Sequence, residues 1–236
     1  MKIYITRHGQ VCPNDFFGST DYPCGDIPLS ELGIKQADRL GAKLKELGFK
    51  GKIFSSPYRR TMMTATEVSK HCDAKVYPDG ALREMFFSKE AASEFTGMNL
   101  AQLKDIFYSI PNDAFLEYPW WTVDVDTNEV IVKRLTVFLD SLLKSDDEEV
   151  LIVGHGASVF GTMCYFNQKY NIGMPADYTE MADYLAQRSL NCSLSCIEID
   201  KDKNMVSAKL FCTDHLTDDM LTSNTNVKER PCVLMF

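Results

Sequence analysis

Two His-Gly pairs, each placed directly after a short apolar run, are the residues most suited to chemistry. Arg7-His8-Gly9 follows the run from Lys2 to Thr6, and His155-Gly156 follows the run from Val150 to Val153. The chain has only 4 histidines, so two of them in the same setting would rarely arise by chance. Imidazole can act as a covalent nucleophile, and a helix that begins after Gly156 offers free N–H groups to an anion. The pairs therefore indicate a phosphate site that contains histidine.

A third segment, which also follows an expected strand, adds cations to this site. Ser55-Ser56-Pro57-Tyr58-Arg59-Arg60-Thr61-Met62-Met63-Thr64-Ala65 follows an expected strand and opens an expected helix. The planar guanidinium fork of arginine donates two hydrogen bonds to a phosphate group. A chain with a formal net charge of -8 needs such local cations, because its overall field repels a phosphorylated substrate.

The elements that must position these residues alternate between strands and helices. Hydrophobic periodicity, caps and turn residues predict strands at residues 2–6, 52–55, 75–77, 150–153, 193–199 and 207–211, and helices at residues 30–47, 60–70, 127–144 and after 156. Ser30 is the expected cap of the first helix, Gly48 its stop, and Leu47 the last residue of its apolar face. The polar turn at residues 200–204 predicts a hairpin between the last two strands.

This alternation predicts an α/β fold, a three-layer α/β/α sandwich with a mostly parallel central sheet. Such sheets carry their active sites at the carboxyl ends of the strands, which is where His8 and His155 stand. We expect a single domain over residues 1–236. The irregular segment at about residues 91–126, with one expected helix, is interpreted as an insertion that covers the active site rather than as a second domain.

Composition and net charge limit the classes of partner that we expect for the chain. The negative net charge argues against a nucleic-acid binder, and no apolar run approaches the length of a membrane span. The start of the chain is too short for a signal peptide before the first motif. The 8 cysteines are irregularly spaced, which is typical of reduced thiols in a cytoplasmic protein. A small phosphorylated substrate is the expected partner, and a homodimer is kept open beside a monomer.

The three motifs, in this order, resemble the histidine phosphatase superfamily, also called the phosphoglycerate-mutase-like family. The resemblance rests on Arg7-His8-Gly9, on Ser-Ser-Pro-x-x-Arg-x-x-x-Thr-Ala from residue 55, and on Gly154-His155-Gly156. It extends from residue 2 to about residue 216. It implies a phosphoglycerate-mutase-like fold and a phosphatase that acts on phosphate monoesters.

The resemblance also implies roles for individual residues. His8 would be the nucleophile that forms a phosphohistidine, and Arg7, Arg60 and His155 would surround the phosphoryl oxygens. Such a cluster stabilises the charge that spreads over these oxygens in the transition state. Arg60 matches the spacing of the motif, whereas its neighbour Arg59 is expected at the surface or at the rim of the pocket.

A leaving alkoxide needs a proton, so a general acid is required. The family takes this proton from a glutamate after the third strand, in a Leu-x-Glu pattern that Leu82-Arg83-Glu84 matches. Two alternatives to a catalytic Glu84 stay open. Arg83 would make Glu84 an ordinary surface ion pair, or Glu90 would be the proton donor.

Three further residues are candidates for binding the phosphate or the substrate. Asn14 matches an asparagine that contacts phosphate in many relatives, Gly156 opens the helix after the second His-Gly pair, and His215 matches a late family segment. Asn14 fits a turn equally well, and His215 fits a structural role equally well. His71 is interpreted as a surface cation at the end of a helix.

No metal and no cofactor are expected. The sequence has no dense carboxylate–histidine ligand cluster and no glycine-rich nucleotide loop. It also departs from the family at two places: Gly-x-Trp-Glu-Gly is missing from residues 88–92, and Phe160 stands where many relatives carry an arginine. These departures leave the phosphate chemistry intact and the substrate open.

Cations over the site distinguish a mutase from a phosphatase. Mutases hold a substrate with two anionic groups and carry paired arginines in the insertion, whereas here only Lys89 and Lys104 lie between Arg83 and Lys133. We therefore expect a metal-independent phosphomonoester hydrolase. The alternatives are a phosphoglycerate mutase-type phosphotransferase and an inactive scaffold that binds phosphorylated ligands.

The insertion is aromatic, which favours an apolar or aromatic leaving group. Its rings, of which some must belong to the core, are Phe107, Tyr108, Phe115, Tyr118, Trp120 and Trp121.

Overall fold

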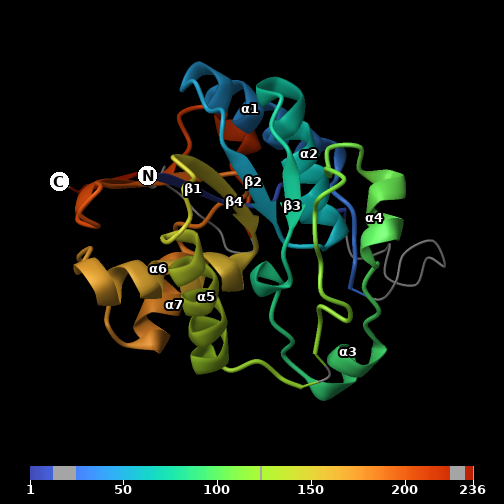
Figure 1. Cartoon of the computed structure of the whole chain (residues 1–236). Coiled ribbons are helices and arrows are strands. Elements are labelled where there is room, and N and C mark those ends of the chain that lie inside the picture. Colours follow the sequence, from blue (N-terminus) through green and yellow to red (C-terminus); the bar gives the residue numbers. More distant parts are fainter. Residues whose placement is uncertain (13–24, 123, 224–231, 236) are drawn as a thin grey trace.

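A seven-stranded sheet forms the centre of the computed structural model, which describes residues 1–12, 25–122, 124–223 and 232–235 (Figure 1). The strands follow the order β3-β2-β4-β1-β5-β6-β7. Their bounds are β1 Lys2–Arg7, β2 Lys52–Ser55, β3 Val76–Pro78, β4 Glu149–Gly154, β5 Leu194–Ile199, β6 Met205–Cys212 and β7 Val233–Met235.

The sheet is parallel in the half that carries the motifs. β1 pairs with β4, β4 with β2, and β2 with β3, all in parallel register. β5, β6 and β7 extend the sheet beyond β1 with antiparallel pairings. The predicted hairpin is confirmed as β5 and β6, and its turn closes through a hydrogen bond from the Asp200 N–H to the Asn204 carbonyl at 2.9 Å.

The helices pack on both faces of this sheet. Their bounds are α1 Glu31–Glu46, α2 Arg59–Cys72, α3 Lys89–Glu94, α4 Leu100–Ile106, α5 Asn128–Leu142, α6 Gly156–Tyr170 and α7 Tyr178–Ala186, with 3-10 turns η2 Gly80–Leu82 and η3 Asp218–Met220. None of these helices is long and apolar enough to cross a membrane.

The sheet separates two hydrophobic cores because side chains alternate across each strand. Ile3 and Ile5 of β1 point to the core beneath α5, α6 and α7, whereas Tyr4 between them points to the core beneath α1 and α2. In β4, Ile152 joins the first core and Leu151 the second. The predicted α/β class and its three-layer α/β/α arrangement are therefore confirmed.

Local signals set the ends of α1 as the sequence predicts. The Ser30 hydroxyl accepts a hydrogen bond from the Gly33 N–H at 3.0 Å and so caps the helix. Gly48 follows the helix with φ of 77°, a left-handed conformation that glycine adopts at little cost. The assignment of Leu47 to the apolar face was wrong, since this cap residue is 48% exposed.

Other elements differ from the sequence prediction. Residues 91–126 contain α4 and most of α3 instead of one helix, and both are shorter than eight residues. α7 and β7 were not anticipated. α7 turns only Met181 and Leu185 into the core, which is too few apolar positions for a clear helical period.

Candidate active site

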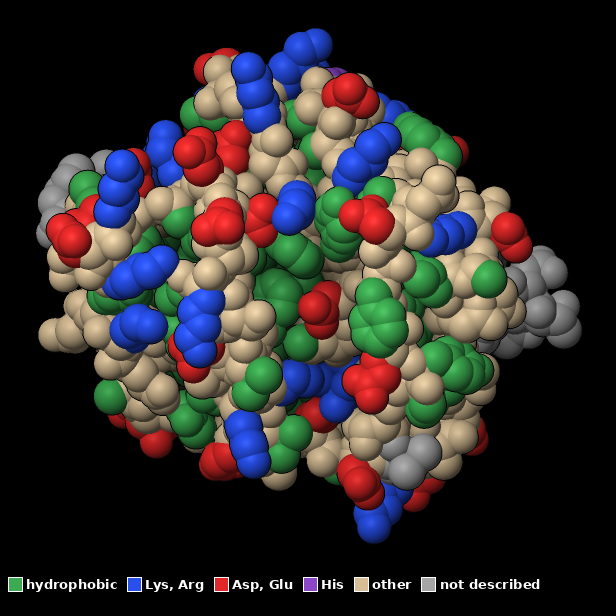
Figure 2. Space-filling view, viewed as in Figure 1, with side chains coloured by type: hydrophobic (Ala, Val, Ile, Leu, Met, Phe, Trp, Pro, Cys, Tyr) green, Lys and Arg blue, Asp and Glu red, His purple; other side chains and the backbone are tan. Residues whose placement is uncertain are grey.

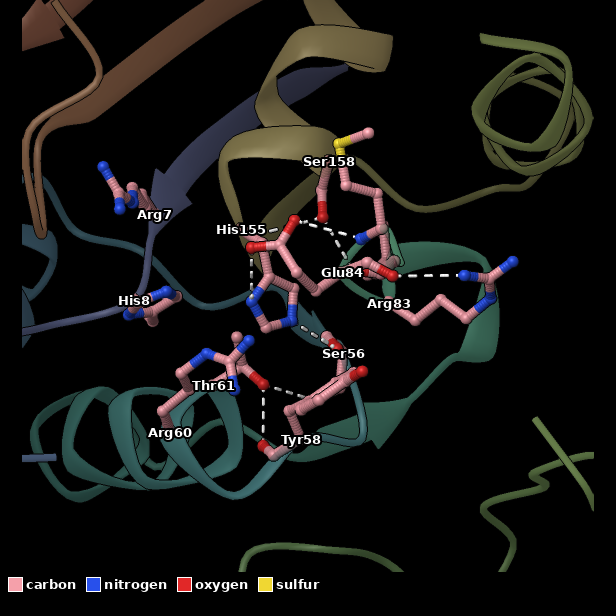
Figure 3. Close-up of polar contacts among 12 residues, drawn as sticks. Arg7, His8, Ser56, Tyr58, Arg60, Thr61, Arg83, Glu84, His155 and Ser158 are labelled. Atoms are coloured by element: carbon pink, nitrogen blue, oxygen red, sulfur yellow. Dashed lines mark hydrogen bonds and ion pairs between the residues drawn. The ribbon is translucent and has the colours of Figure 1, made fainter. Parts of the chain in front are cut away.

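The two His-Gly pairs meet because β1 and β4 are neighbours in register. Arg7 lies opposite Gly154, and the His8 N–H donates to the Gly154 carbonyl at 2.9 Å. The next residue of each strand is a histidine, so the two imidazoles lie side by side with ring centroids 5.3 Å apart (Figure 3).

The His8 ring has a defined proton position. Its Nδ1 lies 2.7 Å from the Gly9 carbonyl oxygen. A carbonyl oxygen can only accept, so Nδ1 carries the proton and Nε2 holds the lone pair. The ring is buried, with 5% of the residue exposed. His8 is therefore set up to present Nε2 as a base or nucleophile.

Both imidazoles are neutral at neutral pH. Burial is the main cause that lowers the pKa of His8 well below its usual value of 6.5, and the charges of Arg60 and Arg7 lower it further. The pKa of His155 is likewise lowered, first by burial and then by Arg60. A neutral imidazole keeps the lone pair that a nucleophile needs.

Two guanidinium groups flank His8 from different elements (Figure 3). Arg7, at the end of β1, donates from Nη1 to the Ser189 carbonyl at 3.1 Å. Arg60, in the first turn of α2, donates from Nη1 to the Gly25 carbonyl at 3.0 Å and lies 4.4 Å from the centroid of the Tyr58 ring. Burial lowers the pKa of Arg7 and the charge of Glu84 raises it, so this carboxylate is close as well.

His155 lies between a hydroxyl and a carboxylate. Its Nε2 is 2.8 Å from the Ser56 Oγ, and its Nδ1 is 3.6 Å from Oε2 of Glu84. The Tyr58 ring packs edge-on against the imidazole, with centroids 5.0 Å apart. These contacts hold a ring that is fully buried, with 0% exposed.

His8, Glu84 and His155 also have the donor atoms of a metal site, all within 4.8 Å of one another. Two imidazoles and a carboxylate are ligands that zinc accepts. Here, however, Arg7 and Arg60 place positive charge beside the cluster. A cation would be repelled by them, whereas an anion is attracted. The donor set therefore fits a phosphate group better than a metal ion.

Several residues that sequence reasoning missed hold the His8 segment. The Asn191 side-chain amide donates to the His8 carbonyl at 2.8 Å, and the Gly9 N–H donates to the Thr64 hydroxyl at 3.1 Å. The backbone of Gly33 lies so close to the Gly9 segment that a Cβ on Gly9 would be 2.5 Å from the Gly33 carbonyl oxygen. Thr64 belongs to the motif at residues 55–65, although no role was predicted for it, whereas Asn191 has no local signal that marks it.

Glu84, rather than Glu90, lies at the histidines. Glu90 is exposed in the first turn of α3 and is absent from the cluster around His155. Arg83 does not bind the Glu84 carboxylate: its guanidinium donates to both carboxylate oxygens of Asp126, at 2.5 and 2.8 Å. The alternative of an Arg83–Glu84 surface pair was therefore wrong.

The remaining candidate residues fall in different places. Asn14 lies outside the described residues. Gly156 is the exposed first residue of α6, at the helix N-terminus. His215 lies 2.9 Å from the Cys192 carbonyl through Nε2, and His71 lies 2.8 Å from Asp38 near the end of α2. Arg59 is partly buried, with Nη2 at 3.9 Å from the Met98 sulfur.

The aromatic side chains of the insertion divide into three groups. Phe107 and Trp120 are buried in the core, and the Trp120 ring packs against Tyr58 with centroids 5.3 Å apart. Trp121 is half-buried at the end of this row of rings. Tyr108, Phe115 and Tyr118 are exposed.

A cleft of about 830 Å³ lies between α5 and residues 115–120. Arg83 and Trp120 line it, together with Phe115, but His8 and His155 do not. Figure 2 shows this hollow near the middle of the face, with hydrophobic side chains inside and charged ones around it. Phe115 therefore faces this cleft and not the histidines.

The arginine arrangement predicts an anion-binding site that depends on Arg60 and not on Arg59. Inorganic phosphate at about ten times its dissociation constant should add about 1.4 kcal/mol to the unfolding free energy. We expect a rise of roughly 3–5 °C in the unfolding midpoint. Thermal unfolding with phosphate at constant ionic strength measures this shift.

Arg59→Gln is the matched control for Arg60→Gln, since it removes the adjacent guanidinium from the same helix. The control should keep the shift, and Arg60→Gln should lose most of it. An equal shift in both variants would contradict a phosphate site at Arg60.

Two buried neutral imidazoles predict that acid weakens the fold. The unfolded chain binds a proton on each histidine below about pH 6.5, whereas the folded-state pKa of His8 and of His155 is lowered far below this. Protons therefore favour the unfolded chain, and stability falls as pH drops through this value.

Urea denaturation of the native protein and of His8→Asn tests this. Between about pH 7.5 and about pH 5.5, the native protein should lose about 1.4 kcal/mol more unfolding free energy than the variant, which lacks one such imidazole. The same loss in both proteins would show that His8 is not held neutral.

Comparison with known proteins supplies an independent view of this site. The sequence profile of the histidine phosphatase superfamily (branch 1) matches residues 3–209. Over 168 residues the chain is 30% identical to a protein of Hydrogenobacter thermophilus named "Putative phosphoserine phosphatase 2". This alignment covers 69% of this chain and 77% of that protein. Over 226 residues it is 24% identical to "Probable phosphoglycerate mutase GpmB" of Proteus mirabilis, with 92% and 96% covered.

The likeness extends to solved structures. The ecdysone phosphate phosphatase of Bombix mori, crystallised with tungstate, aligns with a TM-score of 0.65 at 15% identity, over 97% of this chain and 96% of that one. At this identity the alignment shows the fold.

The profile match includes all three motifs, and the fold likeness covers nearly the whole chain. The chain therefore belongs to the histidine phosphatase superfamily, branch 1, and is a phosphatase of that superfamily.

Proposed function

We propose that the protein hydrolyses phosphate monoesters through a phosphohistidine on His8, without a metal ion. The observation that carries this proposal is the Nδ1–H bond of His8 to the Gly9 carbonyl at 2.7 Å. Because that bond fixes the tautomer, Nε2 keeps its lone pair between the guanidinium groups of Arg7 and Arg60.

The first step transfers the phosphoryl group to the enzyme. The lone pair of His8 Nε2 forms a bond to phosphorus while the bond from phosphorus to the ester oxygen breaks. Arg7, Arg60 and His155 donate hydrogen bonds to the phosphoryl oxygens and stabilise their charge. Glu84 gives its carboxyl proton to the departing oxygen, so the alcohol leaves neutral.

The second step returns the enzyme to its starting state. Glu84, now a carboxylate, takes a proton from a water molecule, and the resulting oxygen attacks phosphorus. The bond from phosphorus to Nε2 breaks, and the electron pair returns to His8. Phosphate then leaves. The position of Glu84, with Oε2 at 3.6 Å from His155 Nδ1, supports this acid and base role beside the phosphoryl site.

Gly156 and His215 have supporting parts in this proposal. The N–H of Gly156, the first residue of α6, is available to a phosphoryl oxygen at the positive end of the helix dipole. His215 holds the Cys192 carbonyl next to Asn191, which in turn holds the His8 carbonyl. We propose a binding role for Gly156 and a supporting one for His215.

Replacement of His8 tests the mechanism. The native protein should release phosphate from p-nitrophenyl phosphate in the presence of a chelator. His8→Ala should lower kcat by at least about 1,000-fold, because it removes the nitrogen lone pair that attacks phosphorus. Quenching in alkaline detergent during turnover of a 32P-labelled ester should trap label that is stable to base and labile to acid, as a phosphohistidine is.

Asp38→Ala, at an exposed carboxylate that pairs with His71 at 2.8 Å, serves as the control and should retain full turnover. Retained turnover in His8→Ala, or activity that the chelator abolishes, would sink the proposed mechanism.

An aromatic or apolar leaving group is the proposed substrate class. A row of ring contacts runs outward from His155 through Tyr58 and Phe95 to Trp121, with neighbouring centroids 4.8–5.9 Å apart. Tyr58 and Phe95 are buried in the core, so the half-buried Trp121 at the end of the row is the ring that an aromatic group of the substrate would contact. The insertion over the site, to which Phe95 and Trp121 belong, is part of a single domain in this proposal.

Naphthyl phosphate and 3-phosphoglycerate distinguish the alternatives. We expect kcat/KM to be at least about fivefold higher for the aryl ester, since stacking on Trp121 contributes roughly 1 kcal/mol. Trp121→Ala should remove most of that preference, whereas Phe115→Ala, 81% exposed, should retain it. Faster conversion of 3-phosphoglycerate to 2-phosphoglycerate than to glycerate would support a mutase instead.

A further inference from the structure

Asp126, the last residue of the insertion, is a buried carboxylate that the mechanism above does not use. Its side chain is 1% exposed. It accepts two hydrogen bonds from the Arg83 guanidinium, at 2.5 and 2.8 Å, and a third from the Phe86 N–H at 3.1 Å. In return, the Asp126 N–H donates to the Phe86 carbonyl at 3.1 Å.

These contacts bracket Glu84. Arg83 precedes it and Phe86 follows two residues later, so Asp126 binds the chain on both sides of the proposed acid. The Arg83 Nη1 also donates to the backbone carbonyl of Glu84 at 3.1 Å. Figure 3 shows the Arg83 side chain extending away from His155 while the Glu84 side chain points toward it.

Two further hydrogen bonds hold the backbone just before Glu84. The Ser158 hydroxyl, in the first turn of α6, donates to the Leu82 carbonyl at 2.6 Å. The Arg134 guanidinium donates from Nη2 to the Arg83 carbonyl at 3.2 Å. By contrast, the carboxylate of Glu84 accepts from the Met85 N–H at 3.1 Å and is 25% exposed. Its distance to His155 is therefore set largely by the clamped backbone.

Asp126 is charged in this setting. Burial raises its pKa, but the hydrogen bonds and charge of Arg83, together with the charge of Arg134, outweigh burial and leave the pKa below its usual value of 3.8. A buried ion pair of this kind is weak support for stability, because an apolar pair of similar volume often serves as well. A bidentate pair does fix geometry.

We propose that Asp126 and Arg83 are positioning residues that hold Glu84 where it can protonate the leaving oxygen. This inference rests on the proposed function, and it adds residues that do not touch the substrate. It also couples the end of the insertion to the proton-transfer step, since Asp126 closes that segment.

The positioning role has a signature that a purely structural role lacks. An alkyl ester has a strongly basic leaving oxygen and needs the proton, whereas p-nitrophenolate leaves without one. A misplaced Glu84 therefore slows the first step, the transfer to His8, selectively for the alkyl ester. Because a misplacement of about 1 Å can cost about 100-fold in rate, the loss on the alkyl ester should be large.

Turnover of phosphoserine and of p-nitrophenyl phosphate by the same variants tests the proposal. Asp126→Asn should lower kcat/KM for phosphoserine by about 10- to 100-fold and kcat/KM for p-nitrophenyl phosphate by less than about threefold. The ratio kcat/KM reports the transfer to His8 and excludes the later water step, in which Glu84 is the base for both esters. Glu84→Gln should show the same selectivity with a larger loss. Asp140 lies in α5, as Arg134 does, and accepts a 2.6 Å hydrogen bond from the Tyr165 hydroxyl. Asp140→Asn removes its charge and should leave the ratio of the two kcat/KM values unchanged.

A double variant keeps the test valid if Asp126→Asn folds poorly. Arg83→Met with Asp126→Leu removes both charges of the bidentate pair together. Arg134, whose Nη1 lies 3.8 Å from Asp126 Oδ1, keeps its hydrogen bond to the backbone carbonyl of residue 83. It should unfold near the native midpoint and still show the selective loss on phosphoserine. Parallel losses of kcat/KM on both esters, or no loss of kcat/KM in this variant, would overturn the positioning role. Persistent turnover in His8→Ala would instead overturn the proposed function itself.

Discussion

The parallel pairing of β1 with β4 is the constraint on which the site depends. Arg7 opposite Gly154 is one register out of many, and a shift by one residue would turn alternate side chains to the other face of the sheet. The two cores forbid such a shift, because Ile3 and Ile5 face one core while Tyr4 faces the other. Hydrophobic burial thus fixes the register of β1 against β4. That register in turn fixes the positions of His8 and His155 relative to each other.

The site gathers positive charge locally, although the chain as a whole is negatively charged. A chain of net charge -8 must bind an anion, and it does so by desolvating Arg7 beside Arg60 and two neutral imidazoles. Bringing these cations together without an anion is unfavourable, since each lowers the pKa of its neighbours. An arriving phosphoryl group relieves that repulsion, so the same desolvation that destabilises the empty site strengthens binding.

The sequence made the catalytic strands predictable because their signals are local. Each of these signals spans only a few consecutive residues. They are the apolar runs of β1, β2 and β4, the Ser30 cap and the three motifs. Asn191 and Asp126 escaped prediction for the opposite reason. Each acts across 40 or more positions, on His8 and on Arg83, and a lone polar residue gives no sign of its distant partner.

Arg83 shows why adjacency in sequence misleads. Next to Glu84 along the chain, it suggested an ion pair that would have kept the acid charged. In the fold its guanidinium is occupied by Asp126, 43 positions away. The distinction matters for chemistry, since a carboxylate bound by arginine resists protonation, whereas a proton donor must carry its proton at the working pH. By engaging Arg83, Asp126 therefore does two things at once: it anchors the backbone on both sides of Glu84, and it orients the Arg83 guanidinium away from the Glu84 carboxyl group.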